Sequence, residues 1–105
     1  MQIKIINKTN WENVYAKLYR KCRRTNVVIK LEFMNNECLL DVDLNKYRYL
    51  FLQNDNIITK QTIRTEIIIL SQNLDTISLE YNPNKECYDA YLINKDVTSY
   101  EQVES

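Results

Sequence analysis

The sequence predicts an α+β fold in which one amphipathic helix near the N-terminus packs on an antiparallel meander of five to six strands, with a further N-terminal strand. Three observations predict it: apolar residues recur at helical spacing within residues 10–24, the apolar period changes to two after Asn26, and turn-forming residues separate the later apolar runs. A chain of 105 residues has room for one core, so we expect a single domain over residues 1–105.

The expected helix over residues 10–24 follows a short β-prone run at residues 2–7. Thr9 and Glu12 have the spacing of a capping box, which satisfies two backbone donors where a helix begins. The apolar positions recur at helical spacing, and they are Trp11, Val14, Tyr15, Leu18 and Cys22. We therefore expect that face to pack inward, while the opposite face carries a basic stripe of Lys17, Arg20, Lys21 and Arg24.

A β-hairpin is expected next, because every second residue from Val27 to Phe33 is apolar and would lie on the same face of a strand. Asn35 and Asn36 suit the tight turn, since asparagine tolerates a positive φ. If Met34 pairs with Glu37, the apolar residues of both strands share one face. The opposing pairs are then Phe33 with Cys38 and, on the other face, Lys30 with Asp41.

The remaining expected elements alternate turns and strands. Turn-forming residues occur at residues 45–46, 54–56 and 82–85. The expected strands are one from Tyr47, one over residues 57–70 that is broken near Lys60, one over residues 76–81 and one over residues 86–93. The polar tail, residues 94–105, is expected to be partly disordered or a short helix.

Missing residue types exclude most familiar enzyme mechanisms, because the sequence contains neither glycine nor histidine. Without glycine there is no P-loop, dinucleotide fingerprint or nucleophile elbow. Without histidine, the commonest general base and the imidazole metal ligands are absent. Cys22, Cys38 and Cys87 show no C-x-x-C spacing, so they indicate neither a disulfide framework nor a metal site. We therefore expect a non-enzymatic cytoplasmic protein with no cofactor, no metal and no membrane association.

Asp41 and Asp43 form the one alternative catalytic site, since two carboxylates on one strand face could bind Mg²⁺ or Mn²⁺. The expected register sets Lys30 opposite Asp41 and Arg48 opposite Asp43, which favours an ion-paired surface over a metal site. A metal-dependent enzyme is thus the third functional hypothesis.

Charge is divided unevenly along a chain whose 14 basic and 14 acidic residues cancel. Residues 1–24 carry a net charge of +6 and residues 25–105 a net charge of −6. The basic stripe Lys17, Arg20, Lys21 and Arg24 could therefore follow a phosphate backbone, dock on an acidic protein surface or simply face water.

A second candidate surface consists of Leu39, Leu50 and Leu52, which the expected register places together on the sheet face of Asp41. Either another element covers this cluster, or it is a dimer or partner interface. Tyr91 in the C-terminal hairpin would suit an interface as well.

The composition also bears on origin, because Asn, Ile, Lys and Tyr make up 42 of the 105 residues, a bias typical of AT-rich DNA in bacteria, phages and mobile elements. The first hypothesis is a protein-binding or inhibitor module, monomeric or homodimeric, that occupies the surface of a partner such as a host defence or nuclease complex. The alternative is a small nucleic-acid-binding or regulatory protein that uses the basic face of helix 10–24.

Overall fold

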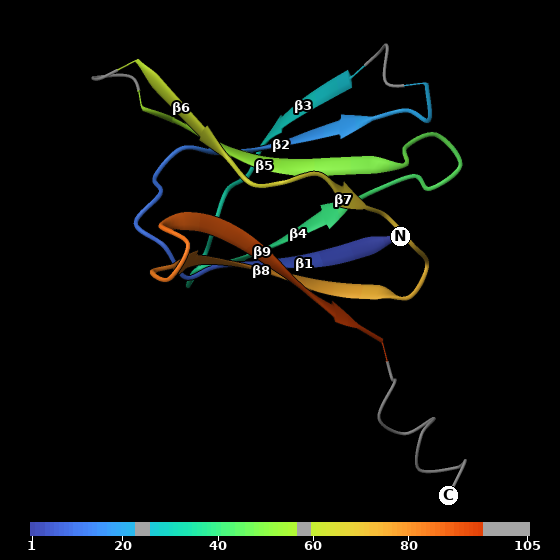
Figure 1. The fold of residues 1–105 in the computed structure, drawn as a ribbon. Coiled ribbons are helices and arrows are strands. Elements are labelled where there is room, and N and C mark those ends of the chain that lie inside the picture. The colour runs from blue at the N-terminus through green and yellow to red at the C-terminus, as the bar shows by residue number, and fades with distance from the viewer. Residues whose placement is uncertain (23–25, 57–59, 96–105) are drawn as a thin grey trace, which may run out of the picture.

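Two β-sheets pack face to face in the computed structural model, which describes residues 1–22, 26–56 and 60–95 (Figure 1). Sheet A contains β1 (Gln2–Asn7), β4 (Glu37–Asp41), β8 (Leu74–Asn82) and β9 (Cys87–Asn94). Sheet B contains β2 (Val14–Tyr19), β3 (Asn26–Lys30), β5 (Tyr49–Asn56), β6 (Gln61–Arg64) and β7 (Ile68–Ile69). The strand order is β4-β1-β8-β9 in sheet A and β3-β2-β5-β6 in sheet B, where β7 also pairs with β5. The described residues contain no helix, so the predicted α+β fold is wrong and the architecture is an all-β sandwich.

The core lies between the two sheets, and alternation is clearest along β1 and β2. In β1, Ile3 and Ile5 are fully buried, whereas Lys4 between them is exposed. The buried residues of both sheets form one continuous cluster, to which sheet A contributes Leu40, Ile77 and Leu79 and sheet B contributes Leu50, Leu52 and Ile68. A slip of one residue in any of these strands would turn its apolar side chains to water, so the pattern fixes the register.

The predicted helix over residues 10–24 is wrong, because its centre is β2, an internal strand of sheet B. Val14 and Leu18 are four residues apart, a spacing that fits one face of a helix and one face of a strand equally well. Ala16 distinguishes the two structures, because it is buried with them and completes a period of two. Trp11 is buried in the loop before β2, whereas Cys22 lies exposed beyond its end.

The predicted capping box is a turn between the two sheets. The Thr9 hydroxyl donates to Asn7 Oδ1 at 2.6 Å and accepts from the backbone N–H of Trp11 at 3.1 Å. Asn7 Nδ2 donates to the Trp11 carbonyl oxygen at 3.1 Å in a buried position. The polar side chains that suggested a helix start therefore stabilise the crossing of the chain from β1 to β2.

The turn at Asn35 and Asn36 is confirmed. Both residues have a positive φ, of 54° and 64°, as the expected tight turn requires. Met34 and Glu37 on either side exchange two backbone hydrogen bonds, at 2.9 and 3.1 Å. Asparagine thus serves here in the left-handed conformation for which most chains use glycine.

The predicted pairing of the two hairpin arms is wrong, because the arms belong to different sheets. Lys30 in β3 lies opposite Tyr15 of β2, and Asp41 in β4 lies opposite Gln2 of β1. The predicted pair of Phe33 with Cys38 does not form either, since Cys38 is paired with β1. Both arms carry one apolar face, and separating them lets those faces meet across the core instead of lying side by side in one sheet.

The rest of the predicted meander is correct only near its end. β5 pairs with β2 rather than β4, because the turn at residues 43–47 carries the chain from sheet A to sheet B. The strand expected over residues 57–70 is two strands, β6 and β7, and residues 57–59 and the tail from residue 96 lie outside the described part. The β8–β9 hairpin and its turn at residues 82–85 are confirmed. β8 also pairs in parallel with β1, which a purely antiparallel meander excludes.

Candidate functional site

The sandwich has two open sides, and each is bordered by the end strands of both sheets. β3 and β4 border one side, where residues of both strands line a depression of about 740 Å³. β7 and β9 border the other side, where they line a groove of about 380 Å³. End strands expose backbone N–H and C=O groups that have no neighbouring strand, so these sides are the natural places to search for a binding site.

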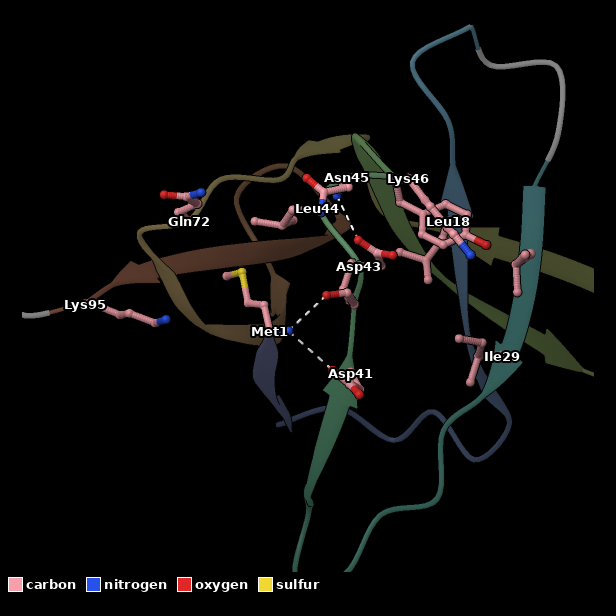
Figure 2. Close-up of a pocket in the computed structure, with 13 residues that line it drawn as sticks. Met1, Leu18, Ile29, Asp41, Asp43, Leu44, Asn45, Lys46, Gln72 and Lys95 are labelled. Carbon is pink, nitrogen blue, oxygen red and sulfur yellow. Dashed lines mark hydrogen bonds and ion pairs between the residues drawn. The ribbon is translucent and has the colours of Figure 1, made fainter.

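The depression beside β4 contains the two carboxylates that the sequence singled out. Asp41 Oδ1 forms an ion pair with the amino group of Met1 at 3.4 Å. Asp43 Oδ1 accepts a hydrogen bond from the backbone N–H of Asn45 at 2.9 Å. Figure 2 shows the lining side chains spread over a broad area, with Lys95 at one end. The two carboxylates therefore stabilise the chain end and the following turn rather than converge on one point.

The ion pairs predicted for these carboxylates are wrong, because β4 does not pair with β3 or β5. Lys30 instead forms an ion pair with Glu32, with 4.0 Å between Lys30 Nζ and Glu32 Oε1. Among residues 1–22, 26–56 and 60–95, no group of three or more His, Cys, Asp or Glu side chains could hold a metal ion.

The groove beside β9 is the more unusual feature, because exposed apolar side chains lie next to a long end strand. Its lining comes from the loop and strand at residues 66–69 and from residues 89–92 of β9. Its large apolar side chains Ile67, Ile69, Tyr91 and Leu92 are 42 to 61% exposed, and Ile93, the next residue of β9, is 50% exposed. Exposed apolar residues gathered in this way mark interaction sites more often than scattered single ones do.

Residues 90–93 of β9 are apolar although this strand lies at the end of its sheet. Its C-terminal half, residues 90–94, contains no charged residue, and Tyr91, Leu92 and Ile93 follow one another without alternation. Leu92 lies opposite the buried Ile77 of β8, yet it is 48% exposed because β9 is the last strand of sheet A. No strand of the described part of the chain covers its free edge.

The rim of the groove is acidic, with Glu66 on one side and Asp89 on the other. A hydrogen bond from Asn82 Nδ2 at 3.0 Å holds the pKa of Asp89 below its ordinary value, with a smaller contribution from the Cys87 thiol. Asp89 is therefore a carboxylate at neutral pH. Partial burial, and then the hydrogen bond to Asp89, raise the pKa of Cys87, so this thiol stays protonated and is a weak nucleophile.

The structure does not bring the predicted leucine cluster together. Leu39 is 63% exposed on the outer face of sheet A, whereas Leu50 and Leu52 are fully buried in sheet B. Sheet A covers the two buried leucines. Of the two alternatives for this cluster, cover by another element therefore holds for Leu50 and Leu52, and an interface does not. Tyr91, the fourth residue of the predicted protein interface, lies in the groove beside β9.

The predicted basic stripe is also divided. Lys17 lies on the outer face of β2, Arg20 and Lys21 are exposed just beyond its end, and Arg24 lies outside the described residues. Sequence reasoning missed Ile67, Ile69 and Leu92 as exposed residues. The available signal was the absence of alternation in both runs, which is equally typical of strands buried on both faces.

Comparison with known proteins adds no relative: no family model, no curated protein and no solved structure matches the chain. The described residues contain no helix long and apolar enough to cross a membrane.

Proposed function

We propose that this chain is a protein-binding module that takes up an extended apolar segment of another protein in the groove between β7 and β9. One observation carries the proposal: five large apolar side chains are exposed beside an end strand that has no strand neighbour in the described chain. A surface of this kind lowers its free energy by burying those side chains against a partner.

Strand addition is the binding mode that this geometry favours. β9 is eight residues long, so a partner strand can form backbone hydrogen bonds along its free edge. Alternate side chains of that partner would then point into the groove, toward Ile67 and Leu92. The hydrogen bonds supply affinity independent of sequence, and the groove selects apolar side chains.

The charges at the rim favour a partner segment that carries lysine or arginine beside its apolar residues. Glu66 and Asp89 are the acidic residues that line the groove. A second copy of the chain would meet this surface with the same surface, because a two-fold interface is self-complementary, and would bring like charges together. We therefore assign the groove to a different protein.

The proposal includes a non-enzymatic role in the cytoplasm. Cys22, Cys38 and Cys87 are free thiols, which suits a reducing compartment. Burial raises the pKa of Cys38, and Cys87 is held protonated as described above, so neither of these thiols is activated as a nucleophile.

The test is selection of peptides of eight to ten residues from a displayed random library against the purified chain. We expect enrichment of sequences that alternate apolar residues and include lysine or arginine. Leu92→Lys should abolish binding of the selected peptides, because it adds a charge to the groove. Val28→Lys is the matched control, since Val28 is 50% exposed on β3 at the opposite side of the sandwich.

Three outcomes would contradict the proposal. The first is a selection that enriches no peptide, and the second is equal binding to both lysine variants. The third is a stable dimer in light scattering that Leu92→Lys converts to monomer, because a second copy would then occupy the groove. Circular dichroism of both variants shows whether a loss of binding reflects a loss of fold.

A further inference from the structure

The outer face of sheet B combines aromatic and basic side chains across four neighbouring strands. Its residues follow from the register: Tyr15 lies between Lys30 and Gln53, Lys17 between Val28 and Phe51, and Tyr19 between Asn26 and Tyr49. Arg64 of β6 extends the face beyond Gln53. Ala16 and Leu18 of β2 point into the core. Because side chains alternate along a strand, Tyr15, Lys17 and Tyr19 point outward.

The centre of this face is a stack of rings and cations. Tyr19 and Phe51 stack with ring centroids 5.7 Å apart. The Lys17 ammonium group lies 5.7 Å from the Phe51 centroid and the Arg64 guanidinium group 4.8 Å from it, so the ring carries two cations. Phe51 is only 5% exposed, and the side chains of Lys17 and Arg64 lie over its ring.

Among the described residues, two of the cations on this face have no carboxylate partner, whereas Lys30 pairs with Glu32. Neither Lys17 nor Arg64 forms an ion pair with a carboxylate within the part of the chain that the structure describes. Asp55, the acid at the edge of the face, accepts hydrogen bonds from Gln53 at 2.8 Å and Thr62 at 3.2 Å. Exposed cations adjoin the face where β2 ends and β5 begins, namely Arg20, Lys21 and Arg48.

We propose that the outer face of sheet B binds single-stranded nucleic acid. Phosphate groups would contact Lys17, Arg64 and the adjoining cations, while bases would stack on the partly exposed tyrosines Tyr15 and Tyr19. An acidic protein surface would match the cations, whereas a single strand matches both the cations and the rings spaced between them. Rings and cations alternating on a sheet are what a single strand needs, since each nucleotide offers one phosphate and one planar base.

This site is separate from the proposed protein-binding groove. The groove lies on an open side of the sandwich between β7 and β9, whereas the aromatic and basic face is the outside of sheet B. Loss of one function therefore leaves the other intact.

The test is fluorescence anisotropy of two labelled oligonucleotides, oligothymidylate and oligouridylate, each of fifteen nucleotides. Each is titrated with the chain at several salt concentrations. We expect binding of at least one of the two, weakening as salt rises, because cations that contact phosphates release counterions. The double variant Lys17→Gln, Arg64→Gln should weaken binding by about tenfold or more and flatten the salt dependence. Glutamine keeps much of the aliphatic length that covers Phe51, so the fold should persist.

Two further variants sharpen the test. Tyr19→Ala should weaken binding by about tenfold at unchanged salt dependence, because it removes a stacking surface and no charge. Lys4→Gln on sheet A is the control that should leave binding unchanged.

Three results would overturn the proposal. One is the absence of binding to both oligonucleotides at low salt. Another is equal weakening by Lys4→Gln and by the double variant, because binding would then reflect overall charge. The third is full competition by polyglutamate at equal charge concentration with no effect of Tyr19→Ala, which would assign the face to an acidic protein.

Discussion

The two open sides of the sandwich differ in how their end strands are protected. On one side β3 and β4 are five residues long and carry charges, with Lys30 on β3 and Glu37 and Asp41 on β4. The turn at residues 43–47 and the chain end at Met1 also line that side. On the other side β9 is eight residues long, and its C-terminal half has no charge. Short, charged end strands resist pairing with other chains, whereas a long apolar one invites it.

This difference is the reason why we propose the side beside β9 as the binding side. The larger depression, beside β4, has polar contacts that are satisfied within the chain, as the Met1–Asp41 ion pair and the Asn45–Asp43 hydrogen bond show. The smaller groove, beside β9, has isoleucine, leucine and tyrosine side chains whose apolar surface remains exposed to water. We therefore base the proposed binding side on the chemistry of the bordering strand rather than on the size of the hollow.

The largest expected effect separates the core from the surface. Leu50→Ala should lower the free energy of unfolding by about 3 kcal/mol, because Leu50 is fully buried between the sheets. Leu39→Ala should change it by less than about 0.5 kcal/mol, since that side chain faces water. Urea denaturation of both variants measures the difference. Similar values for the two variants would refute the packing of sheet A over Leu50.

An intermediate effect is expected when β9 is given the protection that β4 has. The double variant Tyr91→Lys, Ile93→Lys should aggregate more slowly on heating, because lysines on an end strand oppose pairing with another chain. Its unfolding free energy should stay within about 1 kcal/mol of the unchanged chain, since both side chains are already partly exposed. Light scattering during a temperature ramp measures the aggregation. Faster or unchanged aggregation would show that another surface drives self-association.

The smallest effect concerns Asp89 at the rim of the groove. Its pKa is lowered in the folded chain, chiefly by the hydrogen bond from Asn82, so it stabilises the fold above its ordinary pKa. That contribution is lost as the pH falls through the lowered folded pKa. Asn82→Ala should therefore move the midpoint of acid unfolding slightly upward in pH.

Circular dichroism across an acid titration measures this midpoint. Asp89→Asn is the control, because the carboxyl group is then absent and replacing Asn82 as well should shift the midpoint less, through the loss of the two backbone hydrogen bonds that Asn82 Oδ1 accepts from Asn84 and Lys85. A shift of equal size in that background would assign the effect to other groups.

Local sequence patterns predicted the strands better than their partners. Asn35 and Asn36 specify a tight turn by their own backbone preferences, so this turn was predictable. The choice of partner depends on which apolar faces meet across the core, and residues 26–41 alone do not contain that information. Hairpin pairing of β8 with β9 was predictable because the turn joins them directly.

The helix error has a related cause. Val14 and Leu18 satisfy both periods, and only the burial of the small Ala16 distinguishes them. The place of the candidate residues is predictable only in part: Tyr91 lines the proposed groove, whereas Leu50 and Leu52 are covered by sheet A. Exposure of an apolar strand depends on its place at the end of a sheet, which is set by topology rather than by composition.

Residue-resolved amide hydrogen exchange, with and without a selected peptide, tests the central claim most directly. If β9 accepts a partner strand, exchange at amide groups of residues 87–94 should slow markedly on binding, because the added strand buries its free edge. Exchange in β3 and β4 should stay unchanged. Slowed exchange in β3 or β4, with none in β9, would contradict the assignment of the binding side.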